Sequence, residues 1–229
     1  MQAGTLRIGI NFGNVVLARR DAAGAPVGIA VDLANELVRR LEASMELVTY
    51  DAAGKMAEDA KAGAWDAAFL AVDPERANEI VFTSPYLEVE ATYLVPAPSP
   101  LQTVDDVDRD GIRVAVSSKS AYDLFLTRSL QRARLVRAAG PDAAVDLFFT
   151  EKLDALAGLR PWLSDLAKKH DGVRLLDGRF YTVQQAIGVP RGRDDLARTL
   201  QEFVQDVKAS GYVSRLIAAS GIPGVVALP

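Results

Sequence analysis

The stretch FLAVDPERANEIVFTSPY, residues 69–86, leaves an apolar strand, turns at an Asp-Pro pair and then presents a single arginine, Arg76. The run DAAFLAV (66–72) is almost entirely apolar, which is typical of a strand buried on both faces of a parallel sheet. A planar guanidinium at the end of such a strand can form two parallel hydrogen bonds with a carboxylate. The alternative is that Arg76 pairs with Asp73 or Glu79 on a surface turn.

Strands and helices alternate on both sides of a proline-rich segment that contains Pro96, Pro98 and Pro100. Before it we expect strands at 5–11, 45–51, 66–72 and 88–96, a turn at 21–28, and helices over about 30–43 and over 54–63, the second closed by Gly63. After it we expect strands at 111–117, 133–138, 153–159, 173–178 and 183–192, helices at 123–132, 141–151 and 160–170, and two final helices stopped by Gly211 and Gly221. This alternation predicts an α/β fold with mostly parallel sheets.

The last two helices follow a strand but have no further strands of their own, so we expect the chain to cross back to the first sheet. The prediction is a two-lobed α/β fold. Lobe 1 contains residues 1–94 and 188–229, lobe 2 contains 95–187, and the hinge lies near 93–98 and 185–190. Clefts between such lobes bind small molecules at the carboxyl ends of strands.

The composition excludes several classes of function. The 229-residue chain is 49% hydrophobic and carries a net charge of −4, and no basic stripe suits a nucleic acid. It has no cysteine, which excludes disulfides, thiolate nucleophiles and most zinc sites. The single histidine, His170 in AKKHDG, is expected on a solvated face, so neither a Ser-His-Asp relay nor a metal site is predicted. No apolar run approaches the roughly 18 residues of a membrane span.

The amino terminus MQAGTLRIGI lacks the basic start and apolar core of a signal peptide. Met1 could be a start that replaces a removed signal, or a natural start. We expect a periplasmic protein whose signal peptide is absent from this chain because it has been removed.

Several segments, in the same order along the chain, resemble the family 3 extracellular solute-binding proteins of ABC transporters, the polar amino-acid receptor family. They include LRIGIN, GAPVGIAVDLANELVRRLEAS, IRVAVSSKSAYDLFL, EKLDALAG, QQAIGVPRG and EFVQDVKASGYVSRLI, and the sharpest is PERANEIVFTSPY. The resemblance implies a type II periplasmic-binding fold that closes on a small carboxylate-bearing ligand, an amino acid or other organic acid. It also implies a membrane permease as partner, a monomer, no catalysis and no cofactor.

The same resemblance implies that Arg76 grips the ligand α-carboxylate and that Ser120, at the start of the first lobe 2 helix, completes the grip with nearby backbone N–H groups. Ser118 and Ser120 are natural helix N-cap residues, and a helix N-terminus favours an anion. We therefore include Ser118 and Ala121 among the candidate ligand-binding residues. The alternative is that the two serines only cap the helix.

Further candidates lie along the first lobe. Phe12 and Asn14 follow the first strand, where the family places a ligand-facing group, although Phe12 could instead plug the core. Phe69, Leu70 and Asp73 are included from the 66–72 strand and its end. In addition, Trp162 and Tyr122 either line the cleft or pack between helices.

Three departures from the family concern the ligand. Leu159 stands where the amino-acid receptors usually carry the aspartate that holds the ligand ammonium, and Arg160 follows it. Lys119 replaces the glycine that precedes the Ser/Thr, and the span 66–76 looks shorter than in these receptors. Together they favour an anionic ligand without an ammonium group, or a dicarboxylate if Arg160 points inward.

Other interpretations remain open at this level. Arg160 could face solvent or pair with Asp165, and Asp73 could receive an ammonium, which keeps amino acids possible. An enzyme resembling cyclohexadienyl dehydratase would need a general acid, and the candidates Asp73 and Glu75 are better explained by the turn and the helix start. A regulator or sensor domain would require this chain to be a fragment.

Overall fold

A computed structural model describes residues 4–229, so the origin of Met1 lies outside the described residues. The described chain divides into two compact units. One comprises the described residues up to Glu88 together with Gln184–Pro229, and the other is Val89–Val183.

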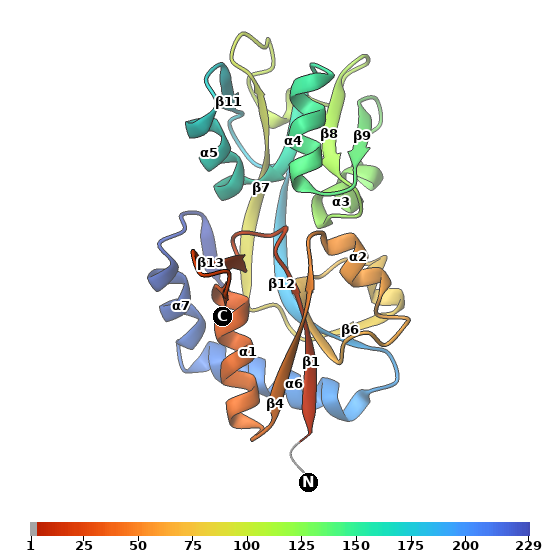
Figure 1. The fold of residues 1–229 in the computed structure, drawn as a ribbon. Coiled ribbons are helices and arrows are strands. Elements are labelled where there is room, and N and C mark those ends of the chain that lie inside the picture. Colours follow the sequence, from red (N-terminus) through yellow and green to blue (C-terminus); the bar gives the residue numbers. More distant parts are fainter. Residues whose placement is uncertain (1–3) are drawn as a thin grey trace. The chain divides into compact units, whose positions relative to one another are not determined.

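The chain passes between the units twice, each time inside a strand (Figure 1). These strands are β7 (Leu87–Pro96) and β12 (Tyr181–Pro190). The units divide after residues 88 and 183, where the sequence suggested 94 and 187. The proline-rich segment therefore ends β7 inside the second unit instead of marking the boundary.

The first unit is a mixed sheet with helices on its two faces. Its strands are β1 (Thr5–Asn11), β4 (Ser44–Tyr50), β5 (Ala67–Ala71) and β6 (Ile80–Phe82), with the short β2 (Arg19–Arg20), β3 (Pro26–Val27) and β13 (Val225–Ala227). Its helices are α1 (Ile29–Arg40), α2 (Ala53–Glu58), α6 (Asp194–Ala209) and α7 (Tyr212–Ser220). β1 runs parallel to β4 and to β5, and β12 joins β5 in antiparallel orientation.

The alternation of side chains along β1 shows which face of the sheet α2 covers. Ile8 and Ile10 are fully buried on one face. Gly9 faces the other way, where a Cβ atom would lie 3.3 Å from the sulfur of Met56 in α2. There, Met56, Trp65 and Leu70 belong to a core cluster beneath α2. The expected parallel arrangement of β1, β4 and β5 is confirmed.

One local prediction in this unit is wrong, and another is refined. Helix α2 ends at Glu58 and does not reach Gly63, which lies in a following turn with φ 62°. The turn lets Trp65 enter the core, where its indole N–H donates to the Met56 carbonyl at 2.9 Å. The turn predicted at 21–28 is present but shorter, because its last part forms the short strand β3, which pairs with β2.

The second unit is a sheet in the order β7-β10-β8-β9, with β11 also paired to β7. Its strands are β8 (Arg113–Ser117), β9 (Arg134–Ala138), β10 (Ala155–Leu159) and β11 (Val173–Leu175), and its helices are α3 (Ala121–Ser129), α4 (Pro141–Thr150) and α5 (Arg160–Lys169). β8 runs parallel to β9 and β10, whereas β10 is antiparallel to β7. Phe148 of α4 and Leu163 of α5 pack on Leu156 of β10 in one core cluster.

Helices α6 and α7 both lie in the first unit. The predicted glycine stops are confirmed, because Gly211 follows the end of α6 with φ 67° and Gly221 caps α7 with φ 65°. Both values fall in the left-handed region that glycine adopts without steric cost.

Candidate functional site

The parallel strands β1, β4 and β5 end at one edge of the first unit, so the segments that follow them gather there. Asn11 at the end of β1 is level with Tyr50 at the end of β4, and Gly9 is level with Ala68 of β5. The edge therefore carries the loop that begins at Phe12 and the turn that leads to Arg76. In α/β sheets this carboxyl edge is the usual position of a ligand.

Arg76 lies at this edge, as the first residue of a short 3-10 helix η1 (Arg76–Asn78). The Asp73 side chain accepts a hydrogen bond from the backbone N–H of Glu75 at 2.8 Å, which shapes the turn after β5. The guanidinium Nη1 of Arg76 then donates to the carbonyl of Ala71, the last residue of β5, at 2.9 Å. The turn thus folds Arg76 back over the end of its own strand.

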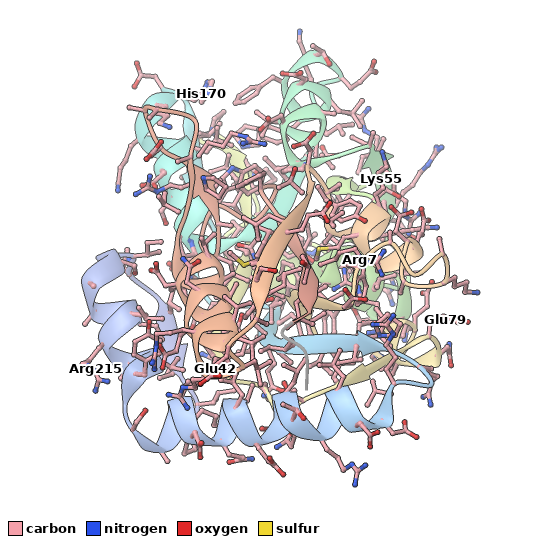
Figure 2. All side chains as sticks on the ribbon, turned by 60° about the horizontal axis from the view of Figure 1, so that its bottom comes forward. Arg7, Glu42, Lys55, Glu79, His170 and Arg215 are labelled. Carbon is pink, nitrogen blue, oxygen red and sulfur yellow. The ribbon has the colours of Figure 1, made fainter. Side chains whose placement is uncertain are left out.

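The environment of Arg76 does not match a surface ion pair. Its exposed fraction is 6%, and that of Asp73 is 1%. Glu79, the other proposed surface partner, lies at the outside of the unit and pairs with Lys61 at 3.0 Å (Figure 2). Arg76 is therefore a buried side chain and does not lie on a surface turn.

The loop after β1 places Phe12 and Asn14 at the same edge. Phe12 is only partly buried, and the guanidinium carbon of Arg20 lies 4.3 Å from its ring centroid, which is a cation–π geometry. The alternative in which Phe12 plugs the core is therefore wrong. The Asn14 side chain accepts a hydrogen bond from the backbone N–H of Val16 at 3.2 Å, so it shapes the loop.

The two candidates within β5 are core residues. Leu70 is 2% exposed and belongs to the cluster beneath α2. Phe69 is 1% exposed on the opposite face of the sheet, where its ring meets Tyr86 edge-on with centroids 6.3 Å apart. Packing accounts for both side chains, and the structure does not place them at the edge with Arg76.

The second unit has a corresponding edge, where parallel strands β8, β9 and β10 end. The loop after β8 carries Ser118, which is partly buried and whose backbone N–H donates to the Ala138 carbonyl at 2.8 Å. Lys119 follows with φ 56°, a left-handed conformation that glycine adopts most easily. The backbone geometry explains why a glycine suits this position in the family that the sequence resembles.

Helix α3 begins directly after this loop with Ser120 as its N-cap. The Ser120 hydroxyl accepts a hydrogen bond from the backbone N–H of Asp123 at 3.1 Å, and the Asp123 carboxylate accepts one from the backbone N–H of Lys119 at 2.7 Å. Arg137 of β9 also binds Asp123 at 2.9 Å. Capping by Ser120 is confirmed, whereas Ser118 does not cap. The first helical amide, that of Ala121, has no acceptor within the helix and remains suited to an anion.

Tyr122 is a polar member of this edge, for which the sequence left open whether it lines the cleft or packs between helices. Its exposed fraction is 8%, and its hydroxyl is hydrogen-bonded to the side chains of Ser117 and Ser120. Burial raises the pKa of Tyr122 to about 12, so the phenol stays protonated at neutral pH. The serine spacing in SSKS could have indicated this cluster, but the inward direction of Tyr122 needed the tertiary structure.

Leu159 and Arg160 lie at the end of β10 on the same edge. Leu159 is 7% exposed. Arg160 donates from Nε to Glu90 of β7 at 2.8 Å, while Asp165 instead binds Lys168 at 3.0 Å, so the proposed Arg160–Asp165 pair is wrong. No sequence signal pointed to Glu90, because only the pairing of β10 with β7 brings it to Arg160.

Two remaining predictions concern side chains away from these edges. Trp162 packs over Gly158, where an added Cβ atom would lie 2.5 Å from the indole, so the packing alternative describes its place. His170 is exposed at the outside of the second unit, as predicted, and stacks on Phe149 with ring centroids 4.9 Å apart (Figure 2). Within residues 4–229, no group of acidic, histidine or cysteine side chains could hold a metal ion, and no helix is both long and apolar enough to cross a bilayer.

Comparison with known proteins adds an independent assignment. Residues 6–219 match the model of the bacterial extracellular solute-binding proteins, family 3. A probable amino-acid ABC transporter periplasmic-binding protein, y4tE of Sinorhizobium fredii, is 23% identical, with 87% of this chain and 74% of that protein covered.

Solved structures share the fold. The solute receptor for L-cysteine of Neisseria gonorrhoeae superimposes with a TM-score of 0.84 at 22% identity, covering 96% of this chain and 91% of the receptor. The ancestral amino-acid-binding protein AncCDT-1, a precursor of cyclohexadienyl dehydratase, gives a TM-score of 0.80 at 21% identity, covering 94% and 95%. These likenesses confirm the predicted α/β periplasmic-binding-protein fold.

Proposed function

Because the chain belongs to the bacterial extracellular solute-binding proteins of family 3, we propose that it is the periplasmic binding component of an ABC uptake transporter. Its ligand is a small molecule with a carboxylate, either an amino acid or another organic acid. The two units close on that ligand about the β7 and β12 crossings, and the closed form delivers it to a membrane permease. The name of the relative from Sinorhizobium fredii supports the transport role.

The observation that carries this proposal is the placement of Arg76. Burying a charged side chain to 6% exposure costs free energy unless hydrogen bonds or an opposite charge compensate it. The turn after β5 holds this side chain at the carboxyl end of the strand. The bond to the Ala71 carbonyl uses one of five guanidinium N–H donors and fixes the orientation of the group. A carboxylate is the ligand group that matches this planar donor geometry.

The second unit contributes the start of α3. The Ser120 hydroxyl accepts from the Asp123 amide and is hydrogen-bonded to the Tyr122 hydroxyl, and the Ala121 amide points along the helix axis. The Ala121 amide, with the Ser120 and Tyr122 hydroxyls beside it, suits the carboxylate that Arg76 binds. In this arrangement each unit alone holds the anion weakly, so binding and closure are coupled.

The test is a binding measurement on Arg76 variants. After a thermal-shift screen of amino acids and organic acids identifies a ligand, we expect Arg76→Gln to weaken its binding by about 10- to 100-fold, since each charge-assisted hydrogen bond contributes roughly 1.5–3 kcal/mol. Arg76→Lys retains the charge but loses the planar fork, so we expect an intermediate loss. Isothermal titration calorimetry measures both.

The matched control is Arg215→Gln, which removes an exposed arginine of α7 that bonds the Ser210 carbonyl (Figure 2). This variant should bind like the parent protein. Circular dichroism must show that Arg76→Gln is folded. If the folded Arg76→Gln variant binds with unchanged affinity, the assignment of Arg76 as the carboxylate anchor is wrong.

The alternative function is a cyclohexadienyl-dehydratase-like enzyme, and the likeness to AncCDT-1 is the observation that favours considering it. Such an enzyme needs a general acid that reaches the substrate. The Asp73 carboxylate instead accepts from the Glu75 amide and shapes the turn. We expect no turnover of prephenate or arogenate by the purified protein, and measurable turnover would replace the transport proposal.

A further inference from the structure

We propose that Glu90 is a positioning residue that holds Arg160 at the carboxyl edge of the second unit as the contact for a second anionic group, so that the protein selects a dicarboxylate over an α-amino acid. This inference rests on the proposed function, because it concerns the same ligand. It names the class of ligand and adds Glu90 to the residues that determine specificity.

The register of two strands brings Glu90 and Arg160 together. Leu159, the last residue of β10, pairs with Ala91 of β7, so Arg160, which follows Leu159, and Glu90, which precedes Ala91, are neighbours. Arg160 donates from Nε to Glu90 at 2.8 Å and from Nη2 to the Gly178 carbonyl. Two bonds in different directions fix the guanidinium at the end of β10, which is the ligand edge of the sheet.

Arg160 retains donors for a ligand. Arginine has five N–H groups, and no hydrogen bond among the described residues uses its Nη1 atom. The side chain is 27% exposed, so part of the guanidinium is accessible to solvent and to a small molecule. A guanidinium that is anchored through Nε and Nη2 loses little further side-chain freedom when an anion binds to Nη1.

The charges around Arg160 favour an anion. Glu90 is the only carboxylate described as paired with Arg160, and it also binds Arg179 at 2.9 Å, so one negative charge faces two positive charges. Burial by itself would raise the pKa of Glu90. The hydrogen bonds from Arg160 and Arg179 outweigh burial and hold the pKa below its ordinary value, so the carboxylate stays ionised. The cluster carries a net positive charge, which attracts a carboxylate and repels an ammonium.

The carboxylates that follow β8 and β9 at this edge do not compensate for this charge. Leu159, beside Arg160, is apolar and 7% exposed. Asp123 is 2% exposed and already forms an ion pair with Arg137. Asp142 lies at the start of α4, after the outer strand β9. An ammonium in the second unit would therefore meet cations and an apolar side chain, whereas a second carboxylate would meet Arg160.

The experiment measures ligand selectivity by isothermal titration calorimetry. The panel contains succinate, glutarate, 2-oxoglutarate, butyrate, L-glutamate and L-arginine. Comparison of 2-oxoglutarate with L-glutamate isolates the ammonium, and comparison of glutarate with butyrate isolates the second carboxylate. We expect a dicarboxylate without an ammonium group (succinate, glutarate or 2-oxoglutarate) to bind at least about tenfold more tightly than butyrate, L-glutamate or L-arginine.

Variants separate the roles of Arg160 and Glu90. Arg160→Gln should lower the affinity for the preferred dicarboxylate by about 10- to 100-fold and that for butyrate by less than about threefold. Glu90→Ala should reduce the ratio of dicarboxylate to butyrate affinity, and Glu90→Gln, which keeps an acceptor for Arg160, should restore it. Arg109→Gln is the matched control, because it removes an arginine of the same unit that pairs with Asp106 outside this cluster, at a side chain that is 58% exposed. Its selectivity should change by less than about threefold.

Two results overturn the inference while the proposed function stands. One is binding of L-arginine or L-glutamate that depends on Arg76 and is tighter than that of every dicarboxylate without an ammonium group. The other is an equal loss of dicarboxylate and butyrate binding in a folded Arg160→Gln variant, which would reveal a purely structural arginine. If no member of the panel binds, or if Arg76→Gln binds all members unchanged, both proposals fail together.

Discussion

At the scale of single residues, Asp66 is a largely buried carboxylate of the first unit that pairs with two arginines. Its side chain is 10% exposed and lies at the start of β5, away from the edge that carries Arg76. Arg7 of β1 donates to it from Nη2 at 2.9 Å and from its backbone N–H at 2.9 Å, and Arg193, at the start of α6, donates to the same carboxylate (Figure 2 labels Arg7). One carboxylate therefore ties two strands and a helix together.

The pKa of Asp66 gives this contact a pH dependence. Burial alone would raise the pKa, but the hydrogen bonds from Arg7 and Arg193 outweigh it and hold the pKa below its ordinary value of 3.8. A carboxylate whose folded-state pKa is depressed stabilises the fold above its unfolded pKa and loses that contribution as the pH falls through the folded value. We expect Asp66→Asn to lower the free energy of unfolding by about 2 kcal/mol at pH 7.

The same substitution should cost progressively less as the pH falls from about 4 through the lower folded-state pKa, because the parent carboxyl then becomes protonated too. Urea unfolding between pH 7 and pH 2.5 measures this convergence. Asp195→Asn is the control, because Asp195 is 94% exposed beside Arg198 and should change stability by less than about 0.5 kcal/mol. A pH-independent effect of Asp66→Asn would contradict the assignment.

At the scale of elements, the packing of α5 on β10 depends on one missing side chain. Gly158 is buried, and a Cβ atom there would lie 2.5 Å from one indole carbon of Trp162 and 3.2 Å from a methyl of Leu163. The helix can approach this strand closely because glycine leaves room for the indole. The approach also sets the position of Arg160, which begins α5.

We expect Gly158→Ala to destabilise the protein by about 1–3 kcal/mol, because the added methyl displaces the indole in a packed core. Trp162→Leu should cost a similar amount through lost contacts. In the double variant the clash is absent, so the two costs should not add, and a urea-unfolding double-mutant cycle measures this coupling. Strict additivity would show that Gly158 serves some other purpose than accommodating Trp162.

At the scale of the whole molecule, the two chain crossings build the second unit from one continuous segment and the first unit from two separate segments. The second unit, Val89–Val183, is one continuous segment with its own core cluster. The first unit needs the segment after Gln184, because β12 pairs with both β5 and β6 and because α6 contributes Leu200 and Val204, which are 0% and 1% exposed.

We therefore expect a fragment of residues 89–183 to fold by itself with cooperative urea unfolding, and a fragment ending at residue 88 to remain largely unfolded. Far-UV circular dichroism and urea titration of the two purified fragments measure this. Mixing the fragment that ends at residue 88 with one that begins at residue 184 is the control, since it restores β12 and α6. Independent cooperative folding of the fragment that ends at residue 88 would contradict the division.

The sequence by itself determined those features that depend on neighbours a few residues apart. The periodicity of apolar residues predicted the order of strands and helices, and Gly211 and Gly221 marked two helix ends because only glycine enters the left-handed region freely. The turn after β5 and the cap at Ser120 are also local, so Arg76 and Ser120 could be proposed from their immediate surroundings.

Only the tertiary structure decided what depends on distant contacts. Glu90 meets Arg160 across 70 residues through the pairing of β7 with β10, and the indole of Trp65 requires the chain to turn soon after α2 ends at Glu58. Burial of Arg76, and of Leu70 in the core, likewise depends on which faces the helices cover. The physical reason is that strand register and helix packing join residues far apart in the chain, and no local pattern records those partners.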